Sequence, residues 1–303
     1  MNGALLRPST LSKSEIVSAN HRITTLMSTF LNLSPDAVDL DMVKTLCADY
    51  SLSPDRAYAE CLAVICGVDA SGKDKAFFHD YFLPMIRCLD VNDFTSDKYY
   101  RALRIPHVVK GSWELTNMSL SPCEAFVCGD PIVTPDLRLI PRIGFFTERF
   151  DYPAVLENGR EWMTLLPNET LTTIPAASKA HGKVLTYGLG LGYYAFTVSE
   201  KDDVDSVTVV ELSKDVISLF TEFILPLFPH KDKIKIINCD AFEYADKYMK
   251  DYDCVFCDIW HDVGDGRELY TKMKQYESRC PSAVFDYWIE DTIKCYMDKR
   301  LWN

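Results

Sequence analysis

The sequence of 303 residues lacks a long apolar run, so no segment is expected to span a bilayer. Residues 1–10 contain an arginine and a proline but no extended apolar core, and a secretory signal is therefore not expected either. The eleven cysteines are odd in number, and several lie within apolar runs. These features predict a cytoplasmic protein whose cysteines are reduced and contribute to its core.

A long basic stripe is also missing, because the formal net charge is −12 and lysines occur only in short pairs such as Lys231 and Lys233. Proteins that bind nucleic acid normally carry such a stripe, so a nucleic-acid partner is not expected. The excess of acidic residues suits a small cationic or neutral substrate, although solubility alone explains it equally well.

The sequence shows no spacing typical of a metal site. Cys254 and Cys257 lie three positions apart in a predicted strand, which turns their side chains to opposite faces of a sheet. No second pair of cysteine or histidine residues has zinc-finger spacing. We therefore expect no metal centre.

A glycine-rich turn is the most informative feature that is present. Residues 184–192 read Val-Leu-Thr-Tyr-Gly-Leu-Gly-Leu-Gly, which predicts a strand and a tight turn, and a helix-like segment begins at Tyr193. Gly188, Gly190 and Gly192 can adopt positive φ and allow the backbone to approach a ligand closely. This is the arrangement by which α/β sheets bind a nucleotide at the end of their first strand.

Three β-rich runs after the turn each end in a carboxylate, namely Glu211, Asp240 and Asp258. The predicted strands are residues 206–211, 234–240 and 252–258. In parallel sheets such residues lie at the edge where ligands bind, and an acid about 20 residues after the glycines binds the ribose hydroxyls of an adenosine ligand. The alternative is that each acid only caps the next helix, which is a frequent role for aspartate.

A nicotinamide dinucleotide is a rival ligand, but its usual fingerprint is G-x-G-x-x-G. Here the third glycine comes one residue early, and Tyr193 holds the expected position. An acid at Asp240 is also less expected for that cofactor.

Residues 182–258 resemble the class I S-adenosylmethionine (SAM)-dependent methyltransferases, and in particular their polyamine-synthase (aminopropyltransferase) relatives. The resemblance lies in Gly-Leu-Gly-Leu-Gly192, Val-Val-Glu211, Cys-Asp240-Ala and Phe-Cys-Asp258. It implies a cofactor that is SAM or decarboxylated SAM. Its cofactor contacts would be Gly188, Gly190, Gly192, Tyr193, Glu211, Leu212, Asp240, Ala241 and Asp258.

An upstream detail is similar to the polyamine-synthase branch, because Glu169 is followed six residues later by Pro175. Two features depart from that branch. Leu191 stands where its glycine motif usually carries an Asp that neutralises the amine of the ligand. The loop after the third strand reads Asp258-Ile-Trp-His261-Asp262 instead of Asp-Ser-x-Asp-Pro. These departures favour methyl transfer, or transfer to another acceptor, over aminopropyl transfer to a polyamine.

The loop after the third carboxylate contains the candidate catalytic residues, Asp258, His261 and Asp262. The histidine is a candidate general base, because the usual pKa of a histidine is near physiological pH, and Asp262 is a candidate to orient it or to bind a cationic acceptor. Trp260, Trp162 and Glu169 are candidate substrate contacts. Each has a plain alternative, since loop histidines are often surface residues and tryptophans usually belong to the core.

The sequence predicts an α/β fold in three segments. Residues 1–108 read as a helical N-terminal domain, 109–169 as a small antiparallel β region, and 170–303 as a doubly wound Rossmann-like SAM-binding domain. The expected helices include 16–33, two that begin at the Ser-Pro pairs of residues 34–35 and 53–54, 76–89 and 97–103. A hairpin turn is expected at residues 157–160. The last expected strand, 282–288, gives a five-stranded sheet whose open edge is covered by helices or by a second subunit, and a homodimer is one possibility.

We expect a SAM-dependent transferase that acts on a small molecule, in the first place a methyltransferase. The alternatives are an aminopropyltransferase that uses decarboxylated SAM, and a non-catalytic SAM-binding protein whose N-terminal helices dock a partner.

Overall fold

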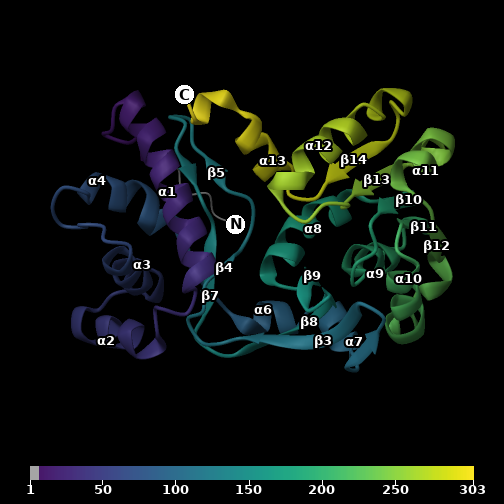
Figure 1. Cartoon of the computed structure of the whole chain (residues 1–303), viewed down its shortest axis with the longest axis horizontal. Coiled ribbons are helices and arrows are strands. Elements are labelled where there is room, and N and C mark those ends of the chain that lie inside the picture. The colour runs from purple at the N-terminus through teal and green to yellow at the C-terminus, as the bar shows by residue number, and fades with distance from the viewer. Residues whose placement is uncertain (1–6) are drawn as a thin grey trace. The chain divides into compact units, whose positions relative to one another are not determined.

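The computed structural model describes residues 7–303, so part of the stretch assessed for a secretory signal, residues 1–6, lies outside the described residues. The chain forms two compact units that alternate along the sequence (Figure 1). Unit 1 contains the described residues up to Asp93 together with Ser119–Phe150 and Lys294–Asn303, and unit 2 contains Phe94–Met118 and Asp151–Ile293. These units do not coincide with the three expected segments, whose roles as separate domains stay a prediction.

Unit 2 is built around a five-stranded parallel sheet in the order β12-β11-β10-β13-β14. Its strands are β10 (Gly182–Tyr187), β11 (Val204–Glu211), β12 (Ile234–Asn238), β13 (Cys254–Cys257) and β14 (Val284–Tyr287). Successive side chains enter two different cores, with Val184 in one and Leu185 in the other. A sheet buried on both faces explains the continuous apolar runs, and the expected Rossmann-like fold with five strands is confirmed.

The helices of unit 2 contribute to both of these cores. They are α7 (Lys98–Ala102), α8 (Pro167–Lys179), α9 (Tyr193–Ser199), α10 (Lys214–Leu219), α11 (Ala241–Tyr248) and α12 (Val263–Lys274), with the short turns η2 (Phe220–Ile224), η3 (Leu225–Leu227), η4 (Lys231–Lys233), η5 (Met249–Asp251) and η6 (Glu277–Arg279). Cys254 lies in the core with α8 and α9, whereas Cys257 lies in the core with α11 and α12. The expected opposite orientation of these two cysteines is therefore confirmed, and all eleven cysteines are free.

A separate antiparallel sheet of unit 2 has the order β2-β3-β8-β9. Its strands are β2 (Val108–Lys110), β3 (Trp113–Leu120), β8 (Phe150–Glu157) and β9 (Arg160–Thr164). Asn158 and Gly159 connect β8 to β9 with φ values of 52° and 74°. Two successive positive φ angles are typical of the tight turns that favour Asn-Gly, so the expected hairpin is confirmed.

Unit 1 combines helices with short strands. Its elements are α1 (Lys13–Leu33), α2 (Leu40–Tyr50), α3 (Pro54–Ile65), α4 (Lys75–Phe77), η1 (Phe78–Phe82), α5 (Leu83–Met85), β1 (Ile86–Leu89), β4 (Phe126–Val127), β5 (Ile132–Val133), β6 (Leu139–Ile140), β7 (Ile143–Phe146) and η7 (Lys299–Leu301), while α6 (Val91–Thr95) and α13 (Glu290–Met297) cross the boundary between the units. The strands form a three-stranded sheet, β1-β7-β4, and a β5-β6 hairpin.

Only one of the two Ser-Pro pairs begins a helix. Ser53 caps α3 through a hydrogen bond from Arg56 N, as expected. The expected start at Ser34 is wrong, because this residue ends α1 by donating its N–H to Phe30 O, and α2 begins after the cap Asp39. The carbonyl of the next residue, Pro35, accepts from Ala125 N, and this long-range bond holds the segment outside any helix.

The expected helix over 76–89 is correct only up to Met85, since Ile86–Leu89 form β1. Strand β1 pairs in parallel with β7, which follows it by more than fifty residues. The segment expected to be one small β region is consequently divided, with β4 to β7 in unit 1 and most of β2, β3, β8 and β9 in unit 2.

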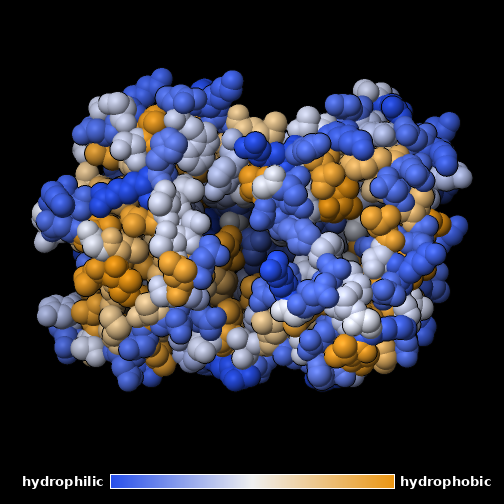
Figure 2. Space-filling view, in the orientation of Figure 1, coloured by the Kyte–Doolittle hydropathy of each residue, from blue (hydrophilic) through white to orange (hydrophobic). Residues whose placement is uncertain are grey.

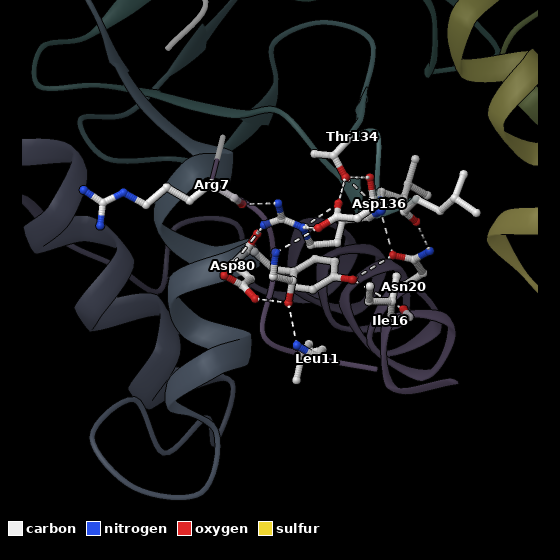
Figure 3. Close-up of polar contacts among 12 residues, drawn as sticks. Arg7, Leu11, Ile16, Asn20, Asp80, Thr134 and Asp136 are labelled. Atoms are coloured by element: carbon white, nitrogen blue, oxygen red, sulfur yellow. Dashed lines mark hydrogen bonds and ion pairs between the residues drawn. The ribbon is translucent and has the colours of Figure 1, made fainter. Parts of the chain in front are cut away.

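A buried polar network stabilises unit 1 (Figure 3). The side chain of Arg138 is only 3 % exposed; it pairs with Asp136 at 3.0 Å and with Asp80 at 3.7 Å, and it donates to the carbonyl of Arg7 at 2.6 Å. Asn20 is fully buried, and both the oxygen and the nitrogen of its side-chain amide have hydrogen-bond partners. It donates to Leu137 O and Leu301 O and accepts from Tyr81 Oη and Leu139 N. A buried network of this kind is stable only because each member has a partner.

Large apolar side chains are exposed on the first three helices of unit 1, including Leu33, Tyr50 and Val64. Figure 2 shows apolar surface over α3. This surface is compatible with the expected docking role of the N-terminal helices, which stays a prediction. Within residues 7–303, none of the helices is both long enough and apolar enough to cross a membrane.

Candidate functional site

The candidate site lies at the carboxyl edge of the five-stranded sheet, where β10, β11 and β13 end. Gly188 N donates to Val210 O at 2.9 Å, and Asp258 N donates to Tyr187 O at 2.9 Å. The glycine turn and the acid after β13 are thus fixed beside each other by backbone hydrogen bonds. This is the edge at which open α/β sheets bind their ligands.

All three glycines of the turn have positive φ, 91° at Gly188, 47° at Gly190 and 76° at Gly192. A Cβ added to them would overlap, respectively, the carbonyl oxygen of Asp258, the sulfur of Met163 and the ring of Phe220. The turn therefore requires glycine for two reasons, its backbone conformation and the close approach of neighbouring protein atoms.

Glu211 binds the backbone on both sides of the site. One carboxylate oxygen accepts from Leu189 N at 3.1 Å, and the other accepts from Ser213 N at 2.7 Å. Burial raises the pKa of Glu211, while the N–H groups of Ser213, Leu189 and Leu212 act in the opposite direction. The acid thus fixes the shape of the glycine turn, and its contact with a ribose stays a prediction.

A small cavity of ≈ 20 Å³ lies against the turn, about the room that one water molecule needs. The turn and α9 form one wall, and Glu169, Asp258 and Met163 also line it. Tyr193 is buried, and its hydroxyl lies 3.4 Å from an oxygen of Asp97. Met163 was not among the residues expected at the site, because nothing in its local sequence distinguishes it from other apolar residues of a hairpin strand.

The two acids that line the cavity, Glu169 and Asp258, both have raised pKa values. Burial raises the pKa of Glu169 to about 7, although the hydroxyl of Thr173 (3.3 Å) and the nearby indole of Trp288 favour its charged form. Burial also raises the pKa of Asp258 well above its usual range, and the negative charges of Glu169 and Glu211 add to the effect. A buried carboxylate without a cation is costly, so this pair is a strong candidate to receive a positively charged ligand.

Asp240 is the cap of α11, and its Oδ1 accepts from Phe242 N at 2.8 Å and from Glu243 N at 3.0 Å. Ala241 is the first residue of that helix, and Leu212 is 69 % exposed in the loop after β11. Among the described residues that line the cavity, none of these three is present. The capping role of Asp240 is therefore present in the structure, and its contact with the cofactor stays a prediction.

The candidate site residues of the loop after β13 lie in different environments. His261 is exposed and lies 3.3 Å from Asp265, while Asp262 caps α12 by accepting a hydrogen bond from Gly264 N. Trp260 is 5 % exposed in the core. Its surroundings favour the packing alternative, and of the three candidate catalytic residues only Asp258 lines the cavity.

Trp162 is 42 % exposed on β9, and its ring and that of His261 form a T-shaped pair with centroids 4.1 Å apart. These two candidates are thus brought together by the structure, next to the strand position that carries Met163. Among residues 7–303 there is no group of three or more potential ligands that could hold a metal ion.

In a comparison with known proteins, residues 165–296 match the family model of the spermine/spermidine synthase domain. The polyamine aminopropyltransferase of Shigella boydii serotype 18 is 26 % identical over 130 residues, which cover 39 % of this chain and 43 % of the relative. That of Escherichia coli O81 is 25 % identical over the same shares. The chain thus matches less than half the length of these relatives.

Among solved structures, the spermidine synthase of Thermotoga maritima is similar with a TM-score of 0.34 and 18 % identity, covering 46 % of this chain and 52 % of that one. The resemblance to the polyamine-synthase branch is confirmed by the family match. The preference for methyl transfer is not confirmed, and the matched relatives favour the aminopropyltransferase alternative.

Proposed function

We propose that this chain is a transferase of the spermidine-synthase type, which uses decarboxylated SAM and transfers an aminopropyl group to an amine. The observation that carries the proposal is the charge of the cavity. Glu169 and Asp258 line it, and the residues around it, all within the described part of the chain, include no lysine, arginine or histidine. The match to the spermine/spermidine synthase domain supports the same choice.

The charge of the cavity discriminates between the two candidate cofactors. SAM carries a carboxylate beside its amine, whereas decarboxylated SAM has lost it and keeps only positive charges at that end. Two like charges about 5 Å apart repel by about 3 kcal/mol at an effective dielectric constant near 20. The pair of acids therefore disfavours SAM and favours the decarboxylated form. Leu191 is an apolar side chain in the core, so no acid stands at that position, and the carboxylates of Glu169 and Asp258 take that role.

The residues of the site also suit the acceptor. Decarboxylated SAM supplies an electrophilic carbon next to its sulfonium: attack by an amine forms a C–N bond as the C–S bond breaks, and the sulfur leaves in the neutral thioether methylthioadenosine. An amine attacks such a carbon only after it has lost a proton, and Asp258 is the candidate base because its carboxylate lies at the end of β13 in the cavity. A cationic ligand near the pair lowers the pKa of both acids and restores their ionised forms. The ionised Glu169 then stabilises a second positive charge of the cofactor or of the amine acceptor.

Binding and turnover separate this proposal from its alternatives. We expect calorimetry to show tighter binding of decarboxylated SAM than of SAM, and an assay with putrescine and decarboxylated SAM to yield a polyamine. Asp258→Asn should abolish turnover and weaken cofactor binding, because it removes the candidate base and one of the two acids of the cavity, with His261→Ala as the comparison for a general base outside the cavity. Preferential binding of SAM, with methyl transfer and no polyamine formed, would refute the proposal.

The cytoplasmic location and the homodimer stay predictions. The third alternative, a SAM-binding protein without catalysis, predicts that Asp258→Asn leaves the biological role unchanged.

A further inference from the structure

Met163 lies against the glycine turn. It lies on β9, the strand at one edge of the antiparallel sheet, where it pairs with Val155. Its sulfur accepts a hydrogen bond from Leu191 N at 2.9 Å and fills the space that a side chain at Gly190 would take. The close approach that glycine permits at position 190 is thus made by a residue of the same unit.

The cavity that remains is too small for any adenosyl compound. Its ≈ 20 Å³ corresponds to about one water, whereas sites for small ligands have volumes of roughly 300 to 1,000 Å³. At least one lining group must therefore move before a ligand enters.

Met163 is the lining side chain that can move at the lowest cost. Tyr193 and Tyr194 are buried, and the latter stacks on Phe256 with centroids 4.2 Å apart. Glu169 is buried in the first turn of α8. Met163 is only partly buried, its unbranched side chain has three rotatable bonds, and its thioether is a weak acceptor, so its hydrogen bond to Leu191 is easily replaced.

We infer that Met163 controls access to the cofactor site, because its side chain and the cofactor compete for the space beside Gly190. This inference rests on the proposed function, since it concerns the same cavity. In the closed arrangement the sulfur of Met163 holds the turn. In the open arrangement a change of its side-chain rotamer frees both the space and the Leu191 N–H for the ligand.

The competition has a measurable consequence. If the closed arrangement is favoured about tenfold, the observed affinity for the cofactor is about tenfold weaker than that of an open site. Met163→Ala removes the competing side chain and should strengthen the binding of decarboxylated SAM by about that factor. Met163→Leu keeps an apolar side chain of similar size, and its dissociation constant should stay near that of the wild type.

Met118→Ala is the matched control. Met118 lies on β3 of the same antiparallel sheet, is also half-buried and does not line the cavity. The same atoms are removed in this variant, so any general loosening of the sheet is reproduced without opening the site. Its dissociation constant should equal that of the wild type. Circular dichroism of each variant verifies the fold.

A second readout follows the side chain itself. The protein labelled with ¹³C at its nine methionine methyl groups gives one resonance for each, and Met163→Leu identifies the resonance of Met163 by its absence. Addition of decarboxylated SAM should shift this resonance and leave that of Met118 in place.

The outcomes separate the inference from the function on which it rests. Equal or weaker binding by Met163→Ala, with an unmoved Met163 resonance, would overturn the inference and leave the proposed cofactor intact. Absence of binding at millimolar cofactor in both the wild type and Met163→Ala would overturn the proposed function and the inference with it. Tighter binding by Met163→Ala, with Met163→Leu and Met118→Ala near the wild type, supports both the proposed function and the inference.

Discussion

The glutamate of the cavity should make the stability of unit 2 depend on pH. The usual pKa of 4.5 applies to Glu169 in the unfolded chain, and burial raises it to about 7 in the folded protein. Between these values the folded state keeps a proton that the unfolded state has released, so stability falls as the pH rises through this window. One pKa unit corresponds to about 1.4 kcal/mol, and the full shift therefore costs roughly 3 kcal/mol above pH 7.

Glu169→Gln preserves the shape and removes the titration. We expect the variant to match the wild type near pH 4.5, where the glutamate is neutral, and to be more stable by roughly 3 kcal/mol at pH 8. The measurement is urea unfolding at a series of pH values, followed by tryptophan fluorescence. Four of the five tryptophans belong to unit 2, so this signal reports mainly on that unit.

Glu243→Gln is the control for this experiment. Glu243 is exposed and occupies the third position of α11, as Glu169 does in α8. The stability of this variant relative to the wild type should not change through the same window. A difference between Glu169→Gln and the wild type that stays constant from pH 4.5 to 8 would refute the reasoning from burial.

Three further substitutions test other parts of the structure. Gly188→Ala introduces a Cβ at positive φ against a backbone oxygen that cannot move away, and thermal unfolding should show a loss of more than about 3 kcal/mol, whereas Gly111→Ala, at φ 63° with open space around it, should lose about 1 kcal/mol. Arg138→Ala removes a buried cation from two half-buried acids and should cost about 3–5 kcal/mol by urea unfolding, against at most about 1 kcal/mol for Arg56→Ala, which breaks the more exposed pair with Glu60. Asp240→Ala removes a helix cap and should cost about 1 kcal/mol; a simultaneous loss of cofactor affinity in calorimetry would show that this acid also contacts the ligand.

Local patterns in the sequence determine most of unit 2. The apolar runs that end at Glu211 and Asp258 predict buried parallel strands, and the Asn-Gly pair predicts the β8–β9 turn, because both signals depend on residues that are neighbours in the chain. The same holds for Ser53, which begins a helix as expected.

Long-range pairing explains the expectations that are wrong. Ile86–Leu89 continue a helical pattern in the sequence but form β1, since their partner β7 is distant in the chain. Ser34 has the composition of a helix cap, yet the next residues form a turn, in which Ala37 N donates to Ser34 O and Pro35 O accepts from the distant Ala125 N. Such contacts leave no periodic signal in the segment that they reshape.

The candidate site divides in the same way. The glycine turn and its three acids follow from spacing, and Asp258 lies in the cavity together with Glu169. Met163 approaches from another sheet, so no motif indicates it. Its position follows from packing alone, so this residue of the cavity wall could not be recognised in the sequence.

The buried amide of Asn20 also affects the order in which the two units can be completed during synthesis. Leu301 O accepts one of its hydrogen bonds, and the side chain of Leu301 packs with Leu139 and Cys295. The ribosome makes these last contributors after every residue of unit 2 has been polymerised. In a nascent chain the hydrogen bond from Asn20 to Leu301 O therefore cannot form until the end of synthesis. All five strands of the parallel sheet of unit 2 have been made before that point.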